Sequence, residues 1–174
     1  MIRETILRLA KADIGIKEIF QNRGWEGEDG KRIDTEMREV GWHPPQPYCA
    51  YWCMKIWYNA YKDLGHNDLA NSVLKILSPN AQVSYKKAQT SIFKVSGDPL
   101  PGSIGIMAKG GTLSGHALIV CRRLKNGLIE TYEGNTNTAG GREGDGFYSK
   151  RRSVSFTKKV DGLYFLGFIN PVEV

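Results

Sequence analysis

Residues 47–58 read Pro47-Tyr48-Cys49-Ala50-Tyr51-Trp52-Cys53-Met54-Lys55-Ile56-Trp57-Tyr58. From Cys49 onward, small and apolar residues recur every three or four positions, the spacing of one buried face of a helix. These residues are Cys49, Trp52, Cys53, Ile56, Trp57, Ala60 and Leu64, and the opposite face carries Lys55, Asn59, Lys62 and Asp63. Prolines precede this stretch and Gly65 follows it. The pattern therefore predicts a helix that begins at or just before Cys49 and stops at Gly65.

A cysteine in the first turn of a helix is chemically distinctive. The backbone N–H groups of that turn have no partners within the helix, and the helix dipole places its positive end there. Both effects favour the thiolate of Cys49, which is the reactive form. Cys49 is therefore placed like a nucleophile.

The rest of the chain predicts helices first and strands second. Helical spacing extends over residues 2–12, 68–77 and 79–89, and a short helix is expected over 34–40 with Asp34 as its N-cap. After Ser91 the apolar residues fall in short β-rich runs separated by glycine turns. These runs are 104–106, 117–120, 128–132, 154–156 and 163–169. We expect an α+β fold in which N-terminal helices pack on a C-terminal antiparallel sheet.

Length and composition limit the class of protein. At 174 residues, the chain is long enough for one well-packed core, so we expect a single domain over 1–174. The net charge of +6 favours polyanionic surroundings such as nucleic acid, anionic lipid or an anionic cell wall. Three cysteines, an odd number, argue against a disulfide framework. No apolar run is long enough to span a membrane, and charges interrupt the first residues where a signal peptide needs an apolar core.

A histidine and two polar residues fall where they could assist Cys49. His116 begins the apolar run 117–120, and Gly115 before it allows close approach of a backbone or a substrate. Asn126-Gly127 predicts a hairpin turn, so the next strand returns antiparallel and brings Glu133 and Asn135 beside His116. A thiolate, an imidazole and a third polar group that orients the imidazole are the parts of a cysteine hydrolase.

The ordered set of motifs resembles a known family. They are Pro47-Tyr48-Cys49-Ala50-Tyr51-Trp52, Pro101-Gly102-Ser103-Ile104-Gly105-Ile106-Met107, Gly115-His116-Ala117-Leu118-Ile119-Val120 and Tyr132-Glu133-Gly134-Asn135-Thr136. The block Glu18 to Gly24 and the late Gly144-Asp145-Gly146-Phe147-Tyr148 with Arg151 and Arg152 add to the likeness. Together they resemble the CHAP family of cysteine, histidine-dependent amidohydrolases/peptidases, in its phage and bacterial branch.

The resemblance implies a papain-like fold and cleavage of an amide bond in bacterial peptidoglycan. Cys49 would be the nucleophile, His116 the general base and then acid, and Glu133 the residue that orients His116, with Asn135 assisting or replacing it. Tyr48, Trp52, Glu18 and Gly115 would contact the substrate. The sequence leaves open whether the N-acetylmuramoyl-L-alanine amide or a bond in the stem peptide or cross-bridge is cut.

A metal site is the main competing interpretation of the cysteines. Cys49-x3-Cys53-x12-His66 begins like a zinc finger, but no second histidine stands at the required spacing. Cys53 and Cys121 are expected in the core. The loop Glu26–Asp29 offers oxygens for calcium but lacks EF-hand spacing. We predict neither a metal nor a cofactor.

Two further interpretations concern binding without catalysis. Lys150-Arg151-Arg152 and Lys158-Lys159 would suit a basic nucleic-acid-binding module, although no aromatic-basic RNA motif or helix-turn-helix accompanies them. The alternative is a catalytically idle binding or structural domain of phage origin. For the hydrolase, the expected partners are peptidoglycan and an immunity protein or a holin, and the expected state is a monomer. Such a protein would be made in the cytoplasm and act on the wall or in the periplasm after release or injection.

Overall fold

The computed structural model describes residues 1–136 and 144–174. Within these residues the helices are α1 (Ile2–Asp13), α2 (Gly27–Glu39), α3 (Cys49–Asp63), α4 (Asn67–Ile76), α5 (Ala81–Ala88) and the 3-10 turn η1 (Lys125–Gly127). The strands are β1 (Glu18–Ile19), β2 (Gly24–Trp25), β3 (Val95–Ser96), β4 (Ile104–Lys109), β5 (Gly115–Arg123), β6 (Leu128–Thr136), β7 (Gly146–Ser153) and β8 (Leu163–Ile169).

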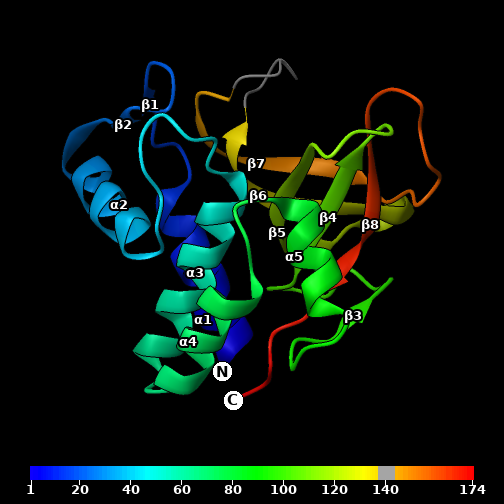
Figure 1. The fold of residues 1–174 in the computed structure, drawn as a ribbon, viewed down its shortest axis with the longest axis horizontal. Coiled ribbons are helices and arrows are strands. Elements are labelled where there is room, and N and C mark those ends of the chain that lie inside the picture. The colour runs from blue at the N-terminus through cyan, green and yellow to red at the C-terminus, as the bar shows by residue number, and fades with distance from the viewer. Residues whose placement is uncertain (137–143) are drawn as a thin grey trace.

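Six of the strands form one antiparallel sheet in the order β3-β8-β4-β5-β6-β7. Helices α1 to α4 gather on one side of the molecule, and α5 lies over β4 and β5 (Figure 1). The short pair β1-β2 stands apart, near α2. The expected α+β class, with N-terminal helices on a C-terminal antiparallel sheet, is confirmed.

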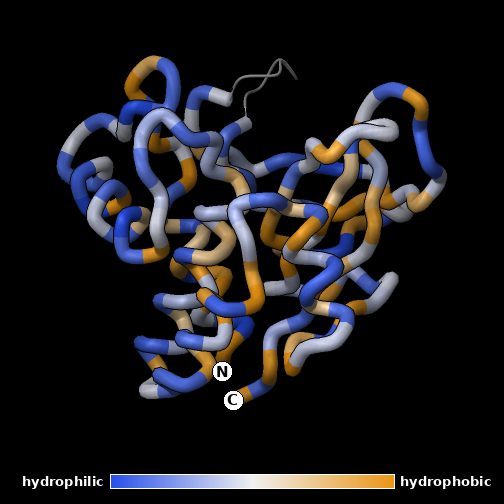
Figure 2. The backbone as a smooth tube through the Cα atoms, viewed as in Figure 1, coloured by the Kyte–Doolittle hydropathy of each residue, from blue (hydrophilic) through white to orange (hydrophobic). Residues whose placement is uncertain are grey.

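The sheet has an apolar cluster on each face. The cluster on the helix side includes Trp52, Trp57, Ile119 and Phe147, so α3 is held between the other helices and the sheet. On the other face, a smaller cluster consists of Met107, Leu118, Val120, Ile129, Phe165 and Phe168. In Figure 2 the apolar segments follow the strands and the inner sides of the helices, whereas the outer turns of α2 and α4 are hydrophilic. Alternate residues of β5 thus serve different cores, as the two-residue period of a strand requires.

Helix α3 begins at the predicted residue, Cys49, and ends before Gly65, whose φ of +80° suits a helix stop. Lys55 departs from the prediction, which put it on the polar face. Its side chain is buried, and Nζ lies 2.5 Å from Asp13 Oδ2 and 2.8 Å from Glu36 Oε2. Helix α3 is therefore buried on that side as well, because carboxylates from α1 and α2 neutralise the lysine.

Helix α2 begins earlier than predicted. It starts at Gly27, not near Asp34, because Glu28 and Asp29 occupy its first turn, where negative charge favours a helix N-terminus. Gly30 packs so closely on β2 that a Cβ there would lie 2.2 Å from the carbonyl oxygen of Trp25. The glycines of this region are typical of a loop, but Gly30 lies within α2 and allows the helix to approach β2 closely.

The strand expected at 154–156 is also misplaced. Residues 154–156 form no strand; the strand just before them is β7, Gly146–Ser153, which pairs with β6 along its length. It alternates buried or partly buried with more exposed positions and carries three basic residues, so counting apolar runs missed it. The other expected helices and strands correspond to α1, α4, α5, β4, β5, β6 and β8.

Candidate active site

Cys49 is the first residue of α3 and lies at the wall of a pocket. Tyr48 before it makes no side-chain cap, and the first turn contains no acidic residue. The positive end of the α3 dipole is therefore not neutralised locally. The Cys49 side chain is partly exposed, so a ligand in the pocket can reach the sulfur.

His116 stands opposite, near the start of β5. Its cross-strand partner on β4 is Met107, and its side chain is buried but lines the same pocket. The imidazole forms a hydrogen bond with the Cys49 thiol and, through Nε2, with Glu133 Oε2 at 2.9 Å. Ionised Glu133 can only accept, so Nε2 carries the proton and Nδ1 is the nitrogen left for Cys49.

Glu133 projects from β6 and is fully buried. Arg152 on β7 donates to both carboxylate oxygens, from Nε to Oε1 and from the terminal nitrogen to Oε2, each at 2.6 Å. Thr131 Oγ1 also donates to Oε1, at 2.6 Å. A paired, bidentate arrangement of this kind keeps a buried carboxylate ionised and fixed in orientation.

The pKa values follow from these contacts. Burial opposes ionisation of the Cys49 thiol, but the hydrogen bond and charge of His116 and backbone hydrogen bonds from Ala117 and Ala50 lower its pKa overall. Burial likewise opposes the imidazolium, yet Cys49 and Glu133 raise the pKa of His116 to about 9. Burial alone would raise the pKa of Glu133, but Arg152 and His116 hold it below the usual carboxyl range. The arrangement favours a thiolate–imidazolium pair at neutral pH.

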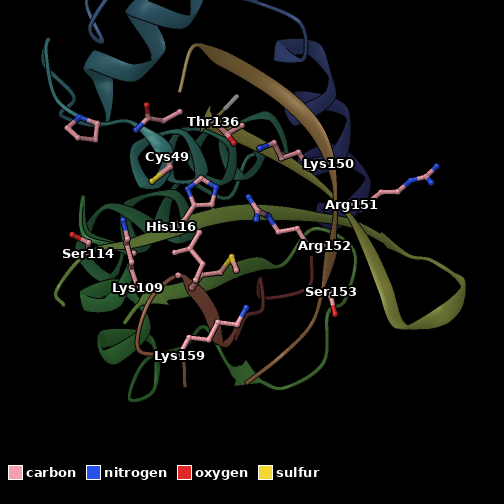
Figure 3. A pocket seen from close by; sticks show the side chains of 16 residues that line it. Cys49, Lys109, Ser114, His116, Thr136, Lys150, Arg151, Arg152, Ser153 and Lys159 are labelled. Atoms are coloured by element: carbon pink, nitrogen blue, oxygen red, sulfur yellow. The ribbon is translucent and has the colours of Figure 1, made fainter. Parts of the chain in front are cut away.

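The pocket that contains Cys49 and His116 has a volume of about 810 Å³. We call it the Cys49 pocket. Besides these two residues, its wall includes Gly115, Asn135 and Thr136 and the basic residues Lys109, Lys150, Arg151, Arg152 and Lys159 (Figure 3). Figure 3 shows the Cys49 sulfur beside the His116 ring, with Arg152 on the far side of that ring. A thiol, an imidazole and basic side chains thus share one opening.

The other sequence-predicted residues lie in three different settings. Gly115 lines the pocket, and a Cβ there would meet Met107 O at 2.4 Å. Asn135 also lines it, with φ of 53° at a bulge between β6 and β7. Tyr48 and Trp52 were expected to contact substrate but are fully buried. Their rings pack against Phe147 in an aromatic cluster next to the start of α3.

Glu18, the remaining predicted substrate contact, belongs to β1 and does not line the Cys49 pocket. Its Oε1 accepts a hydrogen bond from the backbone N–H of Asn22 at 3.2 Å, and the carboxylate contacts the Tyr48 hydroxyl. The Tyr48 phenol, buried and beside this carboxylate, has a pKa raised far above its usual value. Glu18 therefore packs against the aromatic cluster and is not part of the pocket lining.

Sequence reasoning missed the role of Arg152 and of the lysines around the pocket. Arg152 was noted only as part of the family resemblance and of a basic stretch. The available signal was the alternation along 146–153, which puts Tyr148, Lys150 and Arg152 on one face of a strand. A buried glutamate on the neighbouring strand requires a cation on that face.

The remaining cysteines differ from Cys49. Cys53 is buried in the core as expected, and burial raises its pKa well above the usual value. Cys121 was expected in the core but is partly exposed at a bulge between β5 and β6, where the alternation of the strand is interrupted. Within residues 1–136 and 144–174, no group of three or more His, Cys, Asp or Glu side chains is placed to hold a metal ion.

The same described part of the chain contains no helix with both the length and the apolar character to cross a bilayer. Neither the protein-family models nor the curated proteins and solved structures compared with this chain give a match. Function must therefore be argued from the site itself.

Proposed function

We propose that this protein is a cysteine amidohydrolase that cleaves an amide bond of bacterial peptidoglycan. The observation that carries the proposal is the hydrogen-bonded chain Cys49–His116–Glu133 at the wall of an open pocket. A helix-borne thiol facing a sheet-borne imidazole is also the papain-like arrangement that the CHAP resemblance implies.

The chemistry follows from the positions of the three residues. The Cys49 thiolate attacks the amide carbonyl, and the backbone N–H groups at the start of α3 stabilise the resulting oxyanion. Imidazolium His116 then gives its proton to the leaving amine as the C–N bond breaks, which leaves a thioester on Cys49. His116, now neutral, takes a proton from water, and the hydroxide attacks the thioester to release a carboxylic acid and the thiolate. Glu133 keeps the ring oriented throughout.

Peptidoglycan fits the surroundings of this chemistry. The pocket is open enough for a branched peptide attached to glycan, and both the chain and the pocket wall carry excess positive charge. Peptidoglycan peptides bear carboxylates, and wall polymers are anionic, so this charge favours association. The proposal places the site of action at the cell wall.

The test is digestion of purified peptidoglycan by the wild type, Cys49→Ala and His116→Ala. Both variants remove a group that takes part in bond making or proton transfer, so the rate should fall by at least about 10³-fold. Mass spectrometry that scores new amino termini against freed lactyl groups identifies the bond. Cys121→Ser is the matched control, since Cys121 lies outside the pocket, and should digest at the wild-type rate.

Wild-type rates for folded Cys49→Ala or His116→Ala would refute the hydrolase. Absence of digestion by the wild type, together with strongly salt-dependent DNA binding, would instead favour the nucleic-acid interpretation.

A further inference from the structure

Apart from the reacting Cys49 and His116, the ionisable side chains on the described wall of the Cys49 pocket are all basic. Five basic residues line it, and the described part of the lining contains no Asp or Glu. Arg152 is engaged by Glu133, and Arg151 points away from Cys49 and His116 (Figure 3). Lys109, Lys150 and Lys159 remain as cations available to a ligand.

These three lysines differ from many other basic residues of the chain. On the outer surface, Lys31 pairs with Glu28 and Arg38 pairs with Asp34, each at 2.6 Å. Among residues 1–136 and 144–174, no carboxylate lies within ion-pair distance of Lys109, Lys150 or Lys159. No ion pair within the described residues therefore neutralises these lysines, and an anion in the pocket could pair with them.

The lysines come from separate elements that border the reacting pair. Lys109 ends β4, two residues beyond Met107, the cross-strand partner of His116, which places its Cα about 7 Å along the strand from that of Met107. Lys150 lies on β7 opposite Thr131, and Lys159 belongs to the segment between β7 and β8. Burial lowers the pKa of Lys150, although the nearby Glu133 and Asp145 partly oppose this, so a bound anion would further favour its charged form.

We propose that the Cys49 pocket selects substrates with a free carboxylate beside the scissile amide, and that the positive charges of Lys109, Lys150 and Lys159 around the pocket attract that carboxylate. This inference rests on the proposed function and specifies its substrate class. Peptidoglycan stem peptides occur with free carboxyl groups and with the same groups converted to primary amides. The two forms have nearly the same shape, so charge is what the lysines discriminate. The enzyme accordingly prefers the free-acid form.

The experiment uses paired muropeptides that are identical except for free or amidated carboxyl groups. Wild-type kcat/KM should be about tenfold or more higher for the free acid, since the charge that the lysines attract is lost in the amide. This ratio should fall as ionic strength rises. Lys109→Gln and Lys159→Gln should each lower the ratio. Lys125→Gln, at the far end of the β5–β6 hairpin, should leave it unchanged.

A second experiment measures binding and does not depend on turnover. Calorimetry with Cys49→Ala should show tighter binding of the free-acid muropeptide than of its amide. Equal turnover and equal binding of the two forms would overturn the inference while leaving the hydrolase intact. Selective binding of the free acid without wild-type turnover of either form would support the carboxylate site and overturn the proposed function.

Discussion

His116 lies between two groups that favour its charged form, the Cys49 thiolate and the Glu133 carboxylate. Burial alone would favour the neutral ring, so the raised pKa of about 9 reports the strength of these two contacts. Protonation of a leaving amine requires the imidazolium. Activity should therefore fall as pH rises through the pKa of His116, and the alkaline limb of the kcat/KM profile is predicted near pH 9.

Glu133→Gln tests this dependence. Glutamine keeps the shape but removes the negative charge, so the pKa of His116 should fall and the alkaline limb should move to lower pH by about one unit. The rate at neutral pH should also drop, on the order of 10²-fold, because the ring loses its orienting anion. The measurement is kcat/KM against pH for both proteins. An alkaline limb that does not move would show that Glu133 has no effect on His116 ionisation.

The residues of the reacting pair could be predicted because each has a local sequence signal. Cys49 follows prolines and begins an amphipathic pattern, and His116 follows a glycine at the start of an apolar strand. Lys55 and Arg152 have no such signal, since their roles depend on carboxylates far away in the chain, at Asp13 and Glu133. Periodicity shows which face of an element is apolar but does not show where a buried charge finds its partner.

At the scale of elements, the pairing of β6 with β7 brings Arg152 to the catalytic carboxylate. Without Arg152, Glu133 would remain buried with only His116 and Thr131 as partners. Arg152→Gln should therefore destabilise the protein by about 3 kcal/mol, measured by urea unfolding. The double variant Glu133→Gln/Arg152→Gln should be more stable than Arg152→Gln, because no buried charge is left unpaired. If the double variant loses as much stability as the two single variants together, Glu133 and Arg152 are not a coupled pair.

The errors in element boundaries have a common physical origin. Gly27 to Gly30 and Gly146 to Ser153 contain glycines and charges, which are typical of loops in a single sequence. In the fold, Gly30 permits close packing on Trp25, and Lys150 and Arg152 of β7 lie on the face of the strand that borders the pocket. The start of helix α3 was predictable because local propensity, flanking prolines and tertiary packing all agree there.

At the scale of the whole molecule, a buried ion network joins three helices. Asp13 of α1 is fully buried and accepts hydrogen bonds from Arg32 of α2 at 2.8 Å, and from Lys55 and Trp52 of α3 at 2.5 Å and 2.8 Å. Glu36 of α2 completes the network by contacting Lys55 and Arg32. Because Lys55 is in the same helix as Cys49, the network also fixes where α3 presents the thiol to the sheet.

Asp13→Asn should therefore weaken the molecule as a whole. The variant leaves Lys55 buried with one carboxylate, so we expect the free energy of unfolding to fall by about 3 kcal/mol. Asp63→Asn is a matched control, because its ion pair with Arg8 at 2.9 Å also joins α1 to α3 but is exposed, and it should cost under about 1 kcal/mol.

The same unfolding curves test whether the two layers are one cooperative unit. The four tryptophans, Trp25, Trp42, Trp52 and Trp57, lie on the helical side, and Trp25 and Trp52 contact Phe147 of β7, so their fluorescence follows the helical side and its contact with the sheet. Far-ultraviolet circular dichroism follows helices and sheet together. Since α3 packs on both layers, the two signals should change in a single transition, and Asp13→Asn should shift both equally. A fluorescence transition that moves to lower denaturant alone would show that the helical side and its contact with β7 unfold before the rest of the sheet, so that the two layers are not one cooperative unit.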